Sequence, residues 1–186
     1  MPTYEIIGFI ATILCVWMNM KEIIWGFPVA IIASAFYFIV FYQNKLYSDA
    51  GLQIIYIILN FYGWYQWYSG DNKKQLHVSR TPSSLIPILT GLGLLTAGFL
   101  GYGSHQYTDA SLPYLDAATT ATSLVAQWML AKKHLENWLI WIVVDIIYVG
   151  MYFYKELYPT AALYFFLTLL AVQGYVQWKK AMAAAV

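Results

Sequence analysis

The feature that most constrains this chain is a series of seven apolar stretches, each long enough to cross a bilayer as a helix. The stretches are continuous and do not alternate with polar residues, a pattern that favours membrane helices over barrel strands. We expect spans at Tyr4–Met20, Ile23–Gln43, Asp49–Trp67, Leu85–Tyr102, Leu115–Ala131, Asn137–Tyr154 and Leu157–Trp178. The sequence therefore predicts an all-α membrane protein with seven transmembrane helices.

The composition supports this prediction. Of the 186 residues, 61% are hydrophobic and only 10% are charged, whereas soluble domains carry about 25% charged residues. A net charge of +1 provides no field for nucleic acid, and the single cysteine, Cys15, excludes a disulfide framework. His77, His105 and His134 all fall in predicted connections, so we expect no metal and no cofactor. The expected large partner is the lipid bilayer.

The distribution of basic residues predicts the orientation of the chain in the membrane. With seven spans, only Lys45 and Lys155 fall on one side, and the other eight Lys and Arg residues fall opposite. Cytoplasmic loops are enriched in Lys and Arg. We therefore expect the N-terminus outside and the C-terminus in the cytoplasm, with the first span retained because it lacks the features of a cleaved signal peptide.

The chain also matches a shifted copy of itself without a gap. A single shift places Trp17 on Trp128, Tyr37 on Tyr148, and the run from Gly63 on the run from Gly174. Three spans per copy and a single linker span between them make the two copies parallel, with a substrate site between them near the midplane. We expect a first three-helix repeat at 1–68, a cytoplasmic loop, linker helix and outer loop at 69–113, a second repeat at 114–180, and a tail at 181–186.

An intramembrane acid is the strongest candidate for a functional group. Trp138, Trp141, Asp145 and Tyr148 share one helical face, and no predicted span contains Lys or Arg to pair with the acid. A carboxylate among aromatic rings suits a delocalised organic cation, through charge and cation–π attraction. The alternative is a protonated structural Asp. The residue at the matching position of the first repeat is Ser34, which favours ligand recognition.

A second polar and aromatic face lies on the third span. Its mid-span amide, that of Asn60, could orient a substrate amide or ribose, or form an interhelical hydrogen bond. The fifth span adds a polar face that could line a pore. The remaining candidate residues for binding are Gln53, Tyr56, Trp64, Ser123 and Gln127.

Three other residues are left out of the predicted site. Trp67 and Trp178 fall at the cytoplasmic boundary, where an aromatic belt is the usual interpretation. Asp116 falls near the outer surface, where solvation or capping is expected.

Two runs of residues resemble signature stretches of the PnuC family of bacterial vitamin transporters: Asn60–Trp67 and Glu136–Asp145. The resemblance extends over nearly the whole chain. Members carry nicotinamide riboside, with relatives for thiamine or riboflavin. The resemblance implies a SWEET-like 3+1+3 fold, often trimeric, in the bacterial inner membrane. It also implies facilitated diffusion without ion or ATP coupling, and trapping of the vitamin by a cytoplasmic kinase.

The resemblance also implies roles for single residues. Trp138 and Trp141 match substrate-stacking tryptophans, and position 145 matches a site that is Asn in nicotinamide riboside carriers but is Asp145 here. Nicotinamide riboside and thiamine both carry a fixed positive charge that suits a carboxylate, whereas riboflavin is neutral and ranks third. The expected cargo is nicotinamide riboside, with thiamine as the alternative.

Two other classes of seven-helix protein fit less well. A retinal-binding receptor needs a lysine in the middle of the seventh span, and Leu157–Trp178 has none there. A membrane enzyme needs several acids or histidines at one depth, and only Asp145 is deep. We therefore expect a transporter that is not an enzyme.

Overall fold

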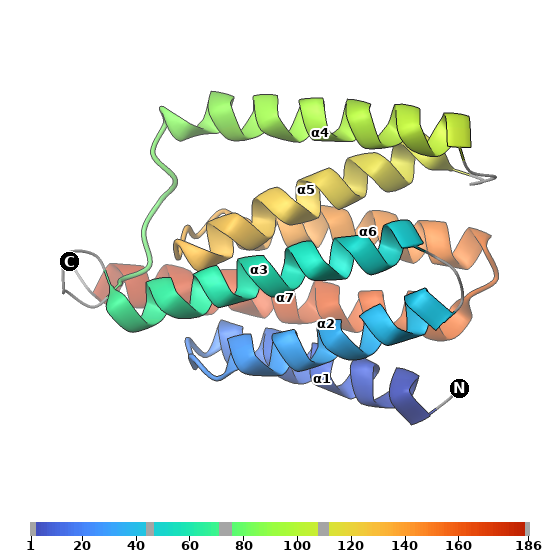
Figure 1. Ribbon diagram of the computed structural model, residues 1–186. Coiled ribbons are helices and arrows are strands. Elements are labelled where there is room, and N and C mark those ends of the chain that lie inside the picture. Colours follow the sequence, from blue (N-terminus) through green and yellow to red (C-terminus); the bar gives the residue numbers. More distant parts are fainter. Residues whose placement is uncertain (1–2, 44–46, 71–75, 108–111, 185–186) are drawn as a thin grey trace.

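The computed structural model describes residues 3–43, 47–70, 76–107 and 112–184 (Figure 1). Within these ranges the chain forms seven helices, which confirms the predicted all-α class. The helices are α1 (Thr3–Met20), α2 (Gly26–Gln43), α3 (Tyr47–Ser69), α4 (Leu85–Tyr107), α5 (Pro113–Ala131), α6 (Asn137–Tyr154) and α7 (Tyr158–Ala184).

Two helices extend well past their predicted ends. α7 continues beyond Trp178, and α4 continues through Gly103 to Tyr107. The prediction that His105 lies in a connection is therefore wrong, because it occupies the last turn of α4. Glycine inside a helix costs only about 1 kcal/mol relative to alanine, so the glycines of this segment do not end the helix.

The lengths and compositions of the helices are those of a membrane protein. α4, α6 and α7 are long and apolar enough to cross a bilayer, and shorter apolar helical stretches occupy Ile7–Met20 and Gly26–Ile39. Large apolar side chains also lie on the outer surface, among them Leu94, Leu95 and Phe99 of α4. Such a surface is suited to contact with lipid.

In chain order α4 separates a first group of three helices, α1–α3, from a second, α5–α7, and α4 itself lies at the edge of the bundle (Figure 1). In the first group α2 contacts both α1 and α3, and in the second α6 contacts both α5 and α7. The groups meet where α3 packs on α5 and where α1 packs on α7. Among the described residues, α4 makes its helix contacts with α5.

The α1–α2 and α5–α6 turns lie at the same end of the molecule as the C-terminal ends of α3 and α7 (Figure 1). We call this end the Lys133 end. A buried aromatic cluster lies there. The rings of Phe27 and Trp67 meet edge to face at 4.9 Å, and those of Trp138 and Trp178 at 5.4 Å. Trp67 and Trp178 are buried. The prediction that they form an interfacial belt is therefore wrong, because the ends of α3 and α7 turn these side chains inward.

Two glycines make room for this cluster. A Cβ atom on Gly174 would lie 2.7 Å from the Trp138 ring, and one on Gly63 would collide with the Phe27 ring. The shift that matches the sequence to itself places Gly63 on Gly174 and Phe27 on Trp138, so the two glycines and the two rings that they accommodate are matched positions. Glycine here permits close packing of a helix backbone against an aromatic ring.

The connection before α4 is docked onto the α5–α6 turn. The backbone N–H of Ser79 donates to the Lys133 carbonyl at 3.0 Å, and that of Leu135 donates to the Ser79 carbonyl at 2.8 Å. The Thr81 backbone N–H and hydroxyl both donate to Glu136 Oε2, at 2.8 and 2.7 Å. These bonds hold residues 79–81 against the Lys133 end.

The Glu136 carboxylate should make this docking sensitive to acid. Partial burial opposes ionisation, but the hydrogen bonds from Thr81 outweigh it and lower the Glu136 pKa from its usual 4.5. Because the pKa of Glu136 is lower in the folded protein than in the unfolded chain, its ionised carboxylate stabilises the fold at pH values above the ordinary pKa. This stabilisation is lost as the pH falls through the lower, folded-state pKa. We expect melting in detergent to show a larger loss of stability below pH 4.5 in the parent than in Glu136→Gln. Parallel pH profiles would contradict this.

Candidate functional site

A cavity of about 290 Å³ lies between the two groups of helices. All helices except α4 contribute to its described lining. Its volume is near the lower end of the range for small-molecule sites, roughly 300–1,000 Å³. A cavity of this size between two helix groups is a suitable place for a small organic substrate.

Nine of the ten predicted site residues, all within the described ranges, line this cavity. They are Gln53, Tyr56, Asn60, Ser123, Gln127, Trp138, Trp141, Asp145 and Tyr148. The structure therefore brings together, around one cavity, side chains that come from three different helices, α3, α5 and α6.

Trp64 is the predicted residue that lies apart from the cavity. Its ring centroid is 6.5 Å from that of Trp25 and 6.4 Å from that of Phe61, in a surface groove. At this level of α3, Gly63 and Trp67 occupy the inward face. Trp64 consequently lies partly buried at the edge of the aromatic cluster, away from the cavity.

Asp145 is buried in the middle of α6, with only 3% of its surface exposed. The ion pair found in the described part of the chain joins Lys133 to Glu22 and does not involve Asp145. The described lining contains a second acid, Asp116, and includes no Lys, Arg or His. Asp116 was left out of the predicted site, but the structure places it in the lining at the first turn of α5. The lining is thus acidic.

Aromatic rings form one wall beside Asp145. The Tyr148 ring lies 4.7 Å from that of Tyr164, and the Tyr152 and Tyr164 rings stack at 5.3 Å. Tyr164 comes from α7 and was missed in the sequence. Polar and apolar residues are spread around α7 without a preferred face, so periodicity gives no sign of which face is inward. Acid and aromatic rings together favour a flat cation.

An amide pair crosses the cavity wall between α3 and α5. The Gln127 Nε2 atom donates to Asn60 Oδ1 at 3.0 Å, and Asn60 Nδ2 donates to the Tyr56 carbonyl at 2.8 Å. The interhelical bond considered for Asn60 is therefore present. Ser123 donates to the Thr119 carbonyl at 2.8 Å. These bonds fix the positions of polar groups that a ligand would meet.

The first two helices contribute residues that sequence reasoning missed. The cavity is also lined by Thr12, Cys15 and Asn19 of α1, and by Ser34 and Tyr37 of α2. The spacing of the α1 residues places them on one face, which is the signal that could have identified them.

Two buried polar atoms of lining residues are without a hydrogen-bond partner among the described residues: Asn19 Oδ1 and Trp138 Nε1. Unpaired buried polar groups are costly. A ligand that supplied an acceptor to the indole N–H would relieve part of that cost.

Comparisons with known proteins identify the family of this chain. The profile of the nicotinamide mononucleotide transporter family matches residues 3–180. The chain is 26% identical to the nicotinamide riboside transporter PnuC of Escherichia coli (strain K12), over 94% of this chain and 84% of that protein. It is 23% identical to the riboflavin/roseoflavin transporter RibM of Streptomyces davaonensis, over 94% and 83% of the two chains.

A solved structure shows the same fold. It is the crystal structure of the vitamin B3 transporter PnuC, with a TM-score of 0.74 and 23% identity, covering 96% of this chain and 81% of that chain. Because the family profile spans nearly the whole sequence, this chain belongs to the nicotinamide mononucleotide transporter family and is a PnuC-family transporter.

Proposed function

We propose that this protein takes up nicotinamide riboside by facilitated diffusion. The observation that carries the proposal is the cavity wall in which the buried Asp145 stands among aromatic rings. The pyridinium ring of nicotinamide riboside is flat and carries a fixed positive charge. Such a ring is attracted both by a carboxylate and by the faces of tryptophan and tyrosine.

The charge of the cavity favours the riboside over its phosphorylated form. A phosphate group adds negative charge, which proteins bind with Arg, Lys or backbone N–H groups. The described lining has Asp116 and Asp145 and lacks any basic side chain. A mononucleotide in this cavity would place its phosphate near carboxylates and gain no basic partner.

Thiamine is the alternative cargo, because its thiazolium ring is also a flat cation and would gain the same attraction. Riboflavin, which the Streptomyces relative is named for, is neutral and gains nothing from a buried carboxylate. The charge argument therefore ranks the two cations above riboflavin.

The proposed architecture is the SWEET-like 3+1+3 arrangement of two parallel repeats, 1–68 and 114–180, with α4 as the linker. The reciprocal packing of α3 on α5 and of α1 on α7 supports it. All seven helices would cross a bacterial inner membrane, with the N-terminus outside and the Lys133 end in the cytoplasm. The exposed apolar face of α4 is available for contact between subunits of a homotrimer.

Net uptake in this mechanism depends on the vitamin gradient alone. Phosphorylation by a cytoplasmic kinase would then trap the vitamin, because the product carries the charge that the cavity disfavours. No ion or ATP is consumed by the carrier.

Competition binding to the purified protein tests the choice of cargo. Nicotinamide riboside is expected to bind saturably and to be displaced by thiamine more effectively than by riboflavin or nicotinamide mononucleotide. Strongest binding of riboflavin or the mononucleotide would contradict the proposal. Gradient-dependent accumulation of unmodified vitamin in proteoliposomes would contradict facilitated diffusion.

A further inference from the structure

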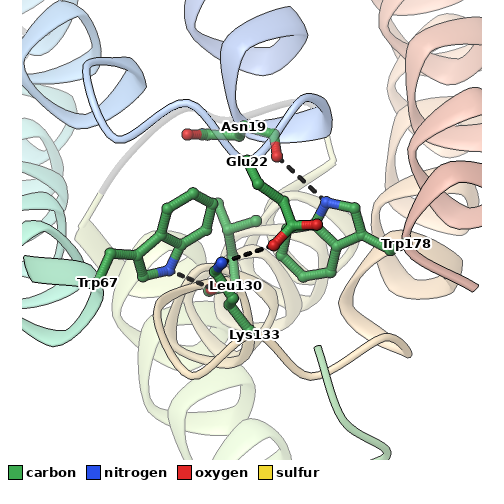
Figure 2. A network of polar contacts seen from close by, with 6 residues as sticks. All are labelled: Asn19, Glu22, Trp67, Leu130, Lys133 and Trp178. Carbon is green, nitrogen blue, oxygen red and sulfur yellow. Dashed lines mark hydrogen bonds and ion pairs between the residues drawn. The ribbon is translucent and has the colours of Figure 1, made fainter. Parts of the chain in front are cut away.

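Two indole hydrogen bonds and an ion pair are among the side-chain contacts that join the two helix groups at the Lys133 end (Figure 2). The Trp67 indole N–H donates to the Leu130 carbonyl at 3.3 Å, so α3 is bonded to the end of α5. The Trp178 indole N–H donates to the Asn19 carbonyl at 3.2 Å, so α7 is bonded to the end of α1.

The third contact is the ion pair between Lys133 Nζ and Glu22 Oε2, at 2.6 Å. It lies beside the two indoles (Figure 2), and the ammonium group is 4.5 Å from the centroid of the Trp67 ring. Lys133 is buried and Glu22 is partly exposed. We call these three contacts the inter-repeat network.

The network is reciprocal under the shift that aligns the two repeats. That shift places Trp67 on Trp178 and Asn19 on Leu130, so each indole bond is the counterpart of the other. The ion pair joins two residues that the same shift superimposes. Glu22 and Lys133 share a left-handed backbone conformation, with φ of 56° and 53°. Equivalent turns of the two groups therefore present opposite charges to each other.

The inter-repeat network lies directly beyond one end of the cavity. Asn19 and Leu130, whose carbonyls accept the indole bonds, are also cavity-lining residues. So is Trp138, whose ring packs edge to face on Trp178. The Trp67 and Trp178 rings are themselves 6.0 Å apart. Buried aromatic rings and a buried lysine thus stand between the cavity and this end of the molecule.

We propose that the inter-repeat network is the gate that closes the cavity at the Lys133 end, with Glu22 and Lys133 as its electrostatic latch. The proposal rests on the proposed function only in requiring that the cavity open alternately to the two faces of the membrane. For a solute to pass this end, the two groups must separate and the ion pair and both indole bonds must break. Closure is favoured by attraction between the opposite charges of Glu22 and Lys133. Exchanging the two residues should therefore preserve it.

The native Cys15 is a reporter for this gate, because it lines the cavity and is the single cysteine of the chain. Its modification by a cationic, membrane-impermeant methanethiosulfonate would be measured in right-side-out and inside-out vesicles. Ser83→Cys in a Cys15→Ser background identifies the face that carries the Lys133 end, because Ser83 is exposed in the connection at that end. No vitamin is needed, so this experiment can fail or succeed independently of the choice of cargo.

The latch predicts a pattern across three variants. Glu22→Gln and Lys133→Gln should each speed Cys15 modification from the Lys133 face at least about tenfold, because each removes the attraction between the two turns, and Glu22→Gln also leaves the buried Lys133 ammonium unpaired. The exchange variant Glu22→Lys/Lys133→Glu should return the rate to within about twofold of the parent, as expected when a coupled pair is restored. Lys179→Gln is the matched control, because this exposed lysine lies at the same end of the molecule and its ring contact is with Tyr175 of its own helix.

Unchanged rates in folded single variants would overturn the proposal. So would equal acceleration from both faces, or an exchange variant that behaves like the single variants. If the single variants do not fold, the exchange variant tests the proposal. A folded exchange variant whose Cys15 is modified at a rate close to that of the parent supports the latch, and an exchange variant that does not fold overturns it.

Discussion

Replacing Asp145 with asparagine is expected to slow uptake of a cationic vitamin at least about tenfold, with little loss of stability. The substitution keeps the shape of the side chain and removes its charge. Loss of one partner from a buried, hydrogen-bonded charge pair costs about 2–5 kcal/mol, and each 1.4 kcal/mol is about a tenfold change in affinity. Asp145 has no cationic partner in the described protein, so the asparagine leaves no protein cation unpaired.

The measurement combines uptake into proteoliposomes with thermal denaturation of the same variant in detergent. Asp116→Asn is the matched control, because it removes the other carboxylate of the described lining from a partly buried position at the end of the cavity. We expect a smaller effect from it. Unchanged uptake by Asp145→Asn would remove this residue from the proposed site, and a loss of uptake that follows a loss of folding would make its role structural.

Replacing Trp178 with alanine is expected to destabilise the protein by about 3–5 kcal/mol, the usual range for a fully buried tryptophan. Its side chain is completely buried against Trp138 and Trp67. The variant leaves a void in the aromatic cluster and also removes the hydrogen bond to the Asn19 carbonyl. Thermal or denaturant unfolding in a fixed detergent measures the change.

Two further substitutions separate the contributions of Trp178. Trp178→Phe retains most of the ring but removes the indole donor, and should cost only about 1 kcal/mol beyond the loss of ring packing. Trp25→Ala removes a tryptophan that is 62% exposed, and should have little effect. Equal stability losses for Trp178→Ala and Trp25→Ala would restore the interpretation of Trp178 as part of an interfacial belt.

Much of the fold could be predicted because membrane helices require long apolar runs. The predicted and observed bounds of the sixth helix agree at both ends, and the fifth differs only by two residues at its start. Helix ends were missed where the composition changes gradually, as in α4 after Tyr102. The acidic residue of the site was also identifiable, because a mid-span carboxylate without a basic residue in any span is unusual in an apolar sequence.

The rest of the cavity could not be read from periodicity. Neither α2 nor α7 has a distinct polar stripe, so the sequence does not predict that Tyr37 and Tyr164 face the cavity. Trp64 and Trp67 illustrate the same difficulty, since both are tryptophans near one end of α3. Only the neighbouring helices place Trp67 inside the core cluster and Trp64 partly buried at its edge, beside a surface groove.

The sequence by itself determined the all-α class, the approximate bounds of the helices and the acidic, aromatic character of the candidate site, because apolar length and rare charges are local properties of the chain. The tertiary structure decided which side chains meet across the two helix groups. Asn60 with Gln127, Trp178 with Asn19, and Lys133 with Glu22 are all pairs from distant parts of the sequence. Such contacts depend on the relative rotation and depth of packed helices, which side-chain packing between the helices determines.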